Sequence, residues 1–205
     1  MPLADLTAVA NLALDHLGEP YLTDYTTDEG TTADAVRVHL PQCVETVLEG
    51  HAWSFATVRV ELTATEDDIP PGEYGSAFDL PEDCLRLIRV NGNDVDDPQR
   101  VFEVQGRLLL LPDEGATAPV VAYISNAVDV AMWPTTFTDA VAFLLAARLA
   151  PKLTQDGNLA AVMLQRHEMA LGKARSKDTR ETRSGENSTM RKLALRSELV
   201  QSRIS

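Results

Sequence analysis

The chain has 205 residues, of which 44% are hydrophobic and 24% are charged. This is the composition of a folded globular protein, which excludes wholesale disorder and any need for disulfide or metal support. No apolar run approaches the roughly 20 residues that cross a bilayer, and the first residues lack the basic start and apolar block of a signal peptide. We therefore expect a soluble protein that is made and kept in the cytoplasm, without a membrane partner.

The net charge of −13 is distributed unevenly. Residues 1–147 hold 6 Lys and Arg against 25 Asp and Glu, a balance of −19, whereas residues 148–205 hold 12 against 6, a balance of +6. One interpretation is a solvated acidic surface with an Arg-rich helix. The other is that the basic end docks on an acidic protein, because a segment with an excess of one charge steers its association with a partner of opposite charge.

Two amphipathic helices are predicted in the N-terminal quarter. Apolar residues recur at helical spacing over residues 3–17, and Gly18 followed by Pro20 provides a stop. The same spacing predicts a second helix over residues 33–51, which Pro41 should kink or split in two.

After Ser54 the hydrophobic period changes from that of a helix to that of a strand. Short apolar runs between turn signals predict strands over residues 55–62, 85–90, 100–104, 107–111 and 120–125. One of these turn signals is Asn91-Gly92-Asn93, and Gln105-Gly106, between two of these runs, predicts a hairpin turn. The helical period then returns over residues 135–150 and 159–183.

These patterns predict an α+β fold, in which the N- and C-terminal helix pairs form an antiparallel bundle with an inserted antiparallel β-rich lobe and an extended C-terminal tail. The expected domains are a helical bundle of residues 1–53 and 131–184, a β-rich domain of residues 54–130, and a tail of residues 185–205. A break at Ser184-Gly185 precedes the tail, which has too little apolar surface to fold by itself. It is therefore either mobile or ordered by a partner.

No pattern of catalytic or metal-ligating residues stands out. Cys43 and Cys84 form no C-x-x-C pair and are interpreted as buried thiols, and the four histidines lack zinc-ligand spacing. Asp94-x-Asp96-Asp97 is similar to the start of a calcium loop, but the central Gly is absent and the motif is interpreted as a turn. We expect no cofactor and no metal, and we assign no catalytic residue.

Aromatic residues at the borders between helical and β segments are interpreted as core anchors, because aromatic side chains at such junctions are more often core than ligand platforms. The predicted anchors are Trp53, Phe55, Trp133 and Phe137.

Several short segments, in this order along the chain, resemble those of the tail tubular protein A family, the head-to-tail adaptors of short-tailed bacteriophages (podoviruses). The N-terminal segments are Ala13-Leu14-Asp15-His16-Leu17-Gly18, Asp28-Glu29-Gly30, Ala33-Asp34-Ala35 and Val47-Leu48-Glu49-Gly50-His51-Ala52-Trp53-Ser54-Phe55-Ala56. The later segments are Leu80-Pro81-Glu82-Asp83-Cys84, Trp133-Pro134 with Phe137-Thr138-Asp139-Ala140, and Ala170-Leu171-Gly172-Lys173-Ala174-Arg175. Ala52 and Ser54 depart from the family's usual residues, and the end of the chain lies outside the resemblance.

The resemblance implies a structural virion protein in the phage neck and not an enzyme. Its copies would form a homo-dodecameric ring that binds the portal protein on one side and the tail nozzle, of the tail tubular protein B type, on the other, with tail fibres as further candidate partners. Duplex DNA would pass through the lumen during ejection without sequence-specific binding. The acidic balance of residues 1–147 agrees with such a lumen, because carboxylates repel the phosphates of DNA.

Two alternatives stay open. Some adaptors of related tails are credited with peptidoglycan hydrolysis, and a muramidase needs only two suitably spaced carboxylates, although the sequence favours no pair among its 31 acidic residues. The chain could instead be an assembly factor that is absent from the virion. A DNA-binding module is disfavoured, because residues 1–147 hold only 6 basic residues.

The basic C-terminal segment is the predicted portal-docking element. Its charged candidates are Arg175, Arg180, Arg183, Arg191, Lys192 and Arg196, and its apolar candidates are Leu193, Leu195 and Leu199. If this segment does not dock, the long helix around Arg166, Lys173 and Arg175 is the next candidate.

Overall fold

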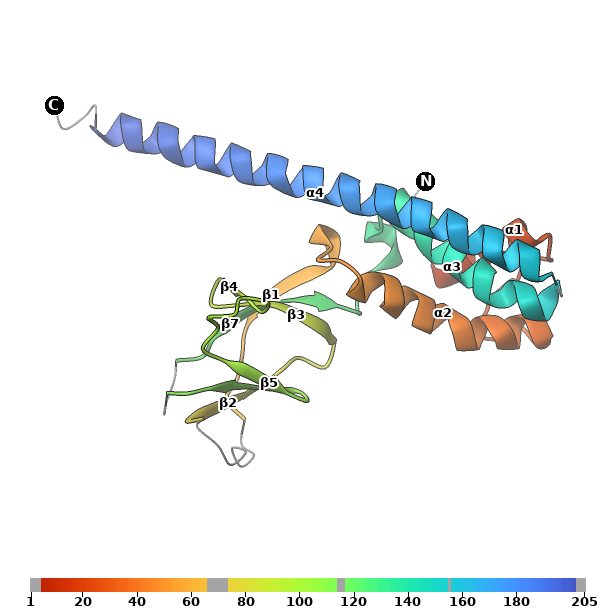
Figure 1. Cartoon of the computed structure of the whole chain (residues 1–205), viewed down its shortest axis with the longest axis horizontal. Coiled ribbons are helices and arrows are strands. Elements are labelled where there is room, and N and C mark those ends of the chain that lie inside the picture. Colours follow the sequence, from red (N-terminus) through yellow and green to blue (C-terminus); the bar gives the residue numbers. More distant parts are fainter. Residues whose placement is uncertain (1–4, 66–73, 114–116, 155, 202–205) are drawn as a thin grey trace. The chain divides into compact units, whose positions relative to one another are not determined.

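The computed structural model describes residues 5–65, 74–113, 117–154 and 156–201, and of residues 183–201 it describes the backbone alone. The chain divides into two compact units, a helical unit of residues 1–43 with 133–205 and an inserted unit of residues 44–132 (Figure 1). The fold is α+β, as the change of hydrophobic period predicts. The first border between the units falls inside a helix, before the Trp53 border that the sequence suggested.

The first helix, α1 (Leu6–Leu17), begins and ends at residues suited to these positions. The Asp5 carboxylate accepts a hydrogen bond of 2.9 Å from the Ala8 amide, which satisfies a free N–H of the first turn. Gly18 ends the helix in the left-handed conformation, with φ of 70°. The predicted start at Leu3 lies outside the described residues.

The second helix, α2 (Thr31–Glu49), contains Pro41 and is not split there. Of the two predicted effects of Pro41, a kink or a split, the split is therefore wrong. Loss of one backbone hydrogen bond at an internal proline costs about 3 kcal/mol. The fully buried side chains of Leu40 and Cys43, on either side of the proline, offset that cost by packing.

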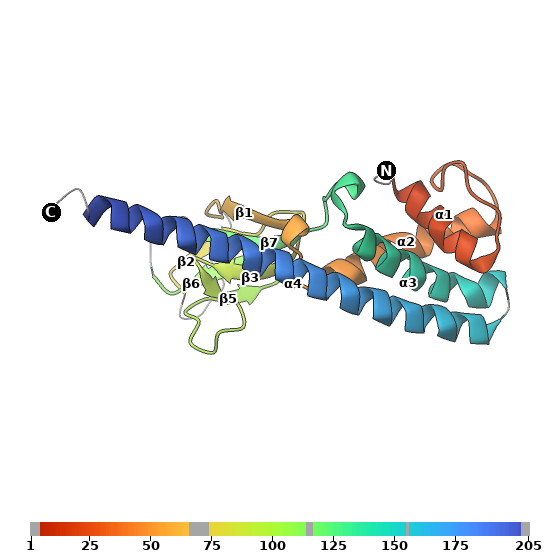
Figure 2. The same cartoon turned by 90° about the horizontal axis from the view of Figure 1, so that it is seen from above.

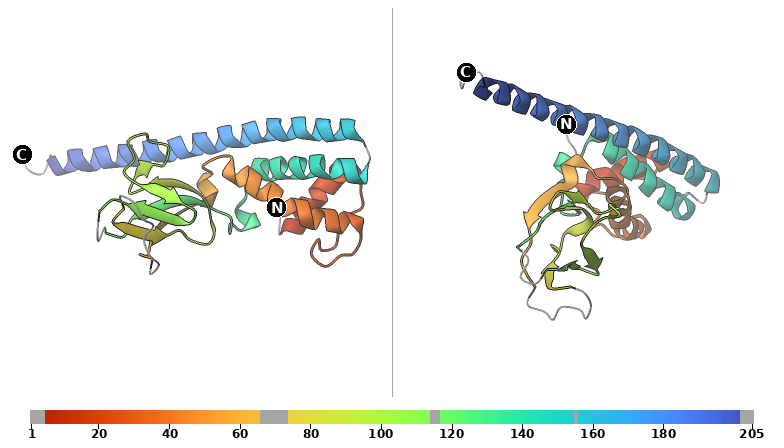
Figure 3. Two further views of the ribbon diagram at one scale, coloured as in Figure 1. Left: turned by 60° about the horizontal axis from the view of Figure 1, so that its bottom comes forward. Right: turned by 60° about the vertical axis from the view of Figure 1, so that its left-hand side comes forward.

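The third and fourth helices are α3 (Thr135–Leu153) and α4 (Gly157–Gln201), and both are longer than predicted. Pro151 lies in the last turn of α3 without ending it at residue 150. The backbone of α4 continues as helix through Ser184 and Gly185, where the sequence suggested a break (Figure 3). A glycine inside a helix costs only about 1 kcal/mol relative to alanine, so it does not by itself end the helix.

Within the helical unit, α3 packs against both α1 and α4. Ten side chains of α3 are buried, among them the fully buried Phe137, Val141 and Leu145. Such a helix, apolar on most sides, is buried between neighbours. Figure 2 shows α3 and α4 side by side, with the chain reversing direction between them.

The inserted unit contains two antiparallel sheets and short 3-10 turns at Ser54–Ala56 (η1) and Val130–Met132 (η2). The first sheet has the order β1-β7-β3-β4 and the second the order β2-β6-β5. Their strands are β1 (Thr57–Glu61), β2 (Ser76–Asp79), β3 (Cys84–Val90), β4 (Asn93–Asp94), β5 (Glu103–Gln105), β6 (Leu108–Leu111) and β7 (Val120–Ser125). One apolar cluster holds side chains of both sheets, including Phe78, Leu109 and Val121.

Two predicted turns are confirmed. The strands β5 and β6 pair with Gln105 opposite Leu108, so the chain reverses through Gly106 and Arg107. The strands β3 and β4 reverse through Asn91 and Gly92, both of which have positive φ, at 50° and 86°. This is the backbone that a two-residue hairpin requires.

Two predicted strands begin later than expected. The chain at Ser54–Ala56 is a 3-10 turn, because the Trp53 carbonyl accepts hydrogen bonds from the Ala56 amide at 3.2 Å and from the Thr57 hydroxyl at 2.6 Å. The strand expected from Arg100 begins at Glu103. Here the Arg100 guanidinium donates to the Val95 carbonyl at 2.6 Å and holds the preceding residues in a turn.

Candidate functional site

One face of α4 is fixed against the rest of the helical unit. Its buried residues recur at helical spacing and include Met163, His167, Ala170 and Ala174. The His167 imidazole is 5% exposed, and its Nδ1 lies 2.8 Å from the carbonyl oxygen of Ala140 on α3. Since a carbonyl can only accept, Nδ1 carries the proton and donates this bond. The bond joins α3 to α4 and thereby determines which side of α4 faces outward.

The adjacent face of α4 carries exposed cationic and apolar side chains. We call this set the α4 stripe, and its members are Val162, Arg166, Met169, Lys173, Lys177 and Arg180. Because they follow one another at intervals of three or four residues, their side chains lie along one side of the helix. The exposed fractions of Val162 and Met169 are 44% and 58%.

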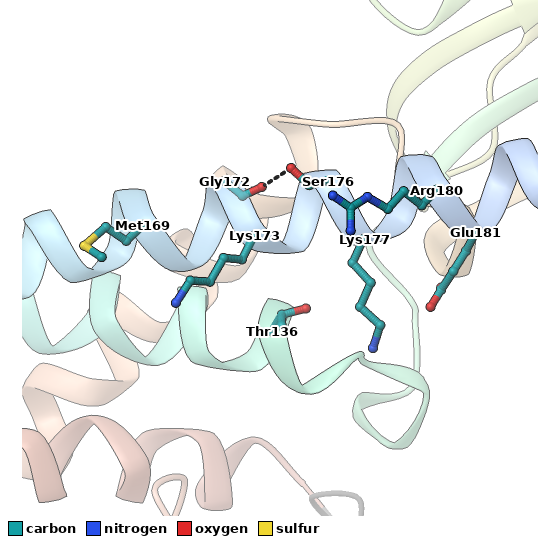
Figure 4. A pocket seen from close by; sticks show the side chains of 8 residues that line it. All are labelled: Thr136, Met169, Gly172, Lys173, Ser176, Lys177, Arg180 and Glu181. Atoms are coloured by element: carbon teal, nitrogen blue, oxygen red, sulfur yellow. Dashed lines mark hydrogen bonds between the residues drawn. The ribbon is translucent and has the colours of Figure 1, made fainter.

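The stripe lies along an open groove between α4 and the first turn of α3. The groove has a volume of about 990 Å³ and runs from Met169 to Glu181 on α4, with Thr136 on the α3 side (Figure 4). Figure 4 shows Lys173 and Lys177 extending from α4 on the side of Thr136. A second cavity of about 280 Å³ shares Thr136, Met169 and Lys173 with the groove and extends it along α4.

Small residues form the floor of the groove. A Cβ atom added at Gly172 would meet no atom within 4 Å, so the space above this residue is open. One turn further, the Ser176 hydroxyl donates to the Gly172 carbonyl at 2.9 Å and so lies against the helix. These two residues leave the α4 backbone accessible between longer cationic side chains.

The second cavity, which adjoins the groove, is built around Phe143 of α3. The imidazole of His16 stacks on its ring, with 4.6 Å between ring centroids, and the guanidinium carbon of Arg166 lies 5.9 Å from the ring centroid. Desolvation raises the pKa of the nearby Asp139 carboxyl, and the positive charges of His16 and Lys173 partly oppose that rise. The groove therefore presents excess positive charge in a protein of net charge −13.

The structure separates the predicted docking residues into three groups. Arg180 lines the groove, whereas Arg175 is half-buried and lies outside the stripe. The remaining candidates follow on the helical backbone of α4, and their side chains lie outside the described residues: Arg183, Arg191, Lys192, Leu193, Leu195, Arg196 and Leu199. Sequence reasoning missed Met169 and Lys177, although helical spacing from Arg166 could have found both.

The predicted aromatic anchors differ in burial. Trp53, Trp133 and Phe137 are buried, with exposed fractions of 1%, 9% and 0%, and Phe55 is half-buried. The Trp53 indole N–H donates to the Val47 carbonyl at 2.9 Å, and Trp133 packs edge-on against Phe137 at 4.9 Å. Buried rings with such contacts stabilise the borders between elements.

Neither the two cysteines nor the acidic turn at Asp94–Asp97 forms a reactive centre. Burial raises the pKa of the Cys43 and Cys84 thiols to about 11, which keeps both protonated at neutral pH. The Asp94 carboxylate accepts a hydrogen bond of 2.6 Å from the Arg89 guanidinium. Over the part of the chain that the structure describes, no three His, Cys, Asp or Glu side chains are grouped as a metal site would require.

Comparison with known proteins adds no relative: no family model matches the chain, and neither does any curated protein. Among the described helices, none is both long and apolar enough to span a bilayer.

Proposed function

We propose that this chain is a head-to-tail adaptor of a short-tailed bacteriophage, a structural protein that joins the portal to the tail nozzle around the DNA channel. The order of its sequence segments, which resemble the tail tubular protein A family, suggests this function. The observation that carries it is a 45-residue helix at the basic end of an otherwise acidic chain, whose last turns extend beyond its neighbour α3. Such a helix suits docking on another protein.

The length of α4 supports a docking role. The first turn of α3, at Thr136, lies beside residues 172–181 of α4, and α3 runs antiparallel to α4 from there. The turns of α4 that follow therefore extend beyond α3. In the proposal, these turns and the predicted docking residues from Arg183 to Leu199 contact the portal, while the helical unit holds the start of α4 in place.

The charge distribution supports a passive role toward DNA. Residues 1–147, with a balance of −19, offer few partners for phosphate groups. An adaptor needs firm contacts with its protein neighbours and weak contacts with the duplex that passes through it. In the proposal, copies of the chain form a ring whose acidic surface lines part of the lumen, and DNA passes without sequence-specific binding.

Mass analysis of purified phage particles tests the proposal. We expect the chain in the particle at a copy number that agrees with a ring, and we expect an antibody against residues 74–113 of the inserted unit to label the neck. A chain that is abundant in infected cells and absent from particles would instead be a non-virion assembly factor. Labelling at the capsid surface or at the distal tail tip would also contradict the adaptor role.

A further inference from the structure

The helix α2 carries an exposed stripe whose charge is opposite to that of the α4 stripe. Asp34, Val38, Glu45 and Glu49 are all exposed and lie on one side of α2, because they are separated by four or seven residues. We call them the α2 stripe. The exposed fraction of Val38 is 60%, and Arg37, which pairs with Asp34, lies beside this stripe.

The two stripes match in composition and in length. Each has an exposed apolar side chain among charged ones: Val38 on α2 and Met169 on α4. At 1.5 Å per residue, the α2 stripe extends over about 22 Å and the α4 stripe over about 27 Å. Both are therefore long enough for one helix to lie along the other over several turns.

The stripes also match in register. Val38 and Glu49 are separated by as many residues as Met169 and Arg180. In a parallel alignment with Val38 opposite Met169, Glu49 lies opposite Arg180 and Glu45 lies within one residue of the level of Lys177. The same alignment brings Asp34, which is already paired with Arg37 of its own helix, to the level of Arg166, again within one residue. The contacts between opposite charges therefore fall mainly on the Glu45 and Glu49 side of the apolar pair.

The small residues of the groove allow a helix to approach closely. Gly172 has open space above it, and the Ser176 hydroxyl is bonded to the backbone of its own helix. A second helix can therefore approach the backbone of α4 closely at these two residues.

We propose that the α4 groove of one copy of this chain binds the α2 stripe of a second copy. This contact uses two different surfaces, so it is heterologous: one copy keeps its α2 stripe free and the other keeps its α4 groove free for a further neighbour. Repetition produces a closed ring or an open filament, according to the rotation at each step. The inference rests on the two stripes and stands whether or not residues 183–205 dock on a portal.

A single pair of helices buries less surface than a stable protein interface, so the contact between two free copies is weak. Cross-linking is therefore the suitable measurement. One full-length variant carries Val38→Cys and the other carries Met169→Cys, and a short bis-maleimide is added to each alone and to their mixture at high protein concentration. We expect a cross-linked dimer in the mixture, little in either variant alone, and none in the wild type, whose own thiols are buried or half-buried.

Charge reversal tests the register. Adding Glu45→Lys and Glu49→Lys to the Val38→Cys variant should reduce the cross-linked yield about tenfold or more, because two attractive pairs become repulsive. Adding Lys177→Glu and Arg180→Glu to the Met169→Cys variant should then restore the yield. Arg86→Glu, an exposed reversal on β3, is the matched control and should leave the yield unchanged.

Three outcomes would overturn the proposal. The first is no cross-linked product in the mixture while circular dichroism shows both variants folded. The second is equal product in each variant alone, which would indicate an isologous or non-specific contact. The third is a yield that does not respond to the reversals, which would leave the acidic and basic residues without a role in association.

Discussion

At the scale of single residues, Gly172 combines an open environment with a helical backbone. We expect Gly172→Ala to raise the free energy of unfolding by about 1 kcal/mol, because alanine has less conformational freedom to lose in the unfolded chain. Urea denaturation followed by circular dichroism measures this change. The control is Gly18→Ala, where φ is 70° and a side chain is strained, so that variant should lose about 1 kcal/mol. A destabilised Gly172→Ala protein would mean that the groove floor is already covered.

The two cysteines provide a second test at this scale. Burial raises the pKa of Cys43 and of Cys84 to about 11, so at pH 8 less than about one thiol in a hundred is ionised. We expect both to react slowly with a thiol reagent in the folded protein and rapidly after unfolding in guanidinium. Val38→Cys, at an exposed position, should add one fast-reacting thiol. Rapid labelling of wild-type protein would contradict the burial of these side chains.

At the scale of secondary structure elements, the hydrogen bond from His167 to the Ala140 carbonyl joins α4 to α3. We expect His167→Ala to lower the free energy of unfolding by roughly 1–3 kcal/mol, because it removes a buried hydrogen bond and leaves a small cavity. Glu168→Ala, at the exposed neighbouring position, should change it by less than about 0.5 kcal/mol. Thermal and urea unfolding of the two variants gives the comparison. Equal losses of stability in both would show that the buried hydrogen bond contributes little to the packing of α4 on α3.

The elements that sequence reasoning predicted well are those with a strong local signal. The strand Val120–Ser125 and the turns at Gly92 and Gly106 agree with the structure, since apolar runs and glycine positions determine them locally. The errors lie at two poor helix residues. Buried neighbours hold α2 together at Pro41, and at Gly185 the cost of a single glycine is too small to end α4.

The candidate site could be predicted only in part, for a related reason. Net charge along the chain singles out the basic segment as a candidate for docking, and helical spacing alone connects Arg166 with Arg180. The groove itself depends on the position of α3, because Thr136 supplies its other side. The spacing of residues within one helix contains no information about that neighbour, so Met169 and Lys177 were not chosen.

At the scale of the whole molecule, the free chain should be largely monomeric at micromolar concentration. A weak contact between copies, opposed by a net charge of −13 on each, does not hold a ring together without a template. Sedimentation velocity at moderate salt measures the oligomeric state. A stable ring formed by the purified chain at micromolar concentration would contradict templated assembly.

The docking role makes its own prediction about the end of the chain. Truncation after Ser184 removes the last turns of α4 and leaves the buried face from Met163 to Ala174 intact. We expect the truncated chain to stay folded, with an unfolding temperature close to that of the full chain, since the removed turns extend beyond α3. A large fall in the unfolding temperature would mean that this segment stabilises the fold instead of docking.

Binding of the full and truncated chains to purified portal rings of the parent phage tests the adaptor role most directly. We expect the full chain to bind, with an affinity that falls as salt rises because cationic side chains supply part of the contact, and we expect the truncated chain to lose binding. If the truncated chain binds the portal with unchanged affinity at every salt concentration, the last turns of α4 are not the docking element. If neither chain binds at any salt concentration, the proposed function is wrong.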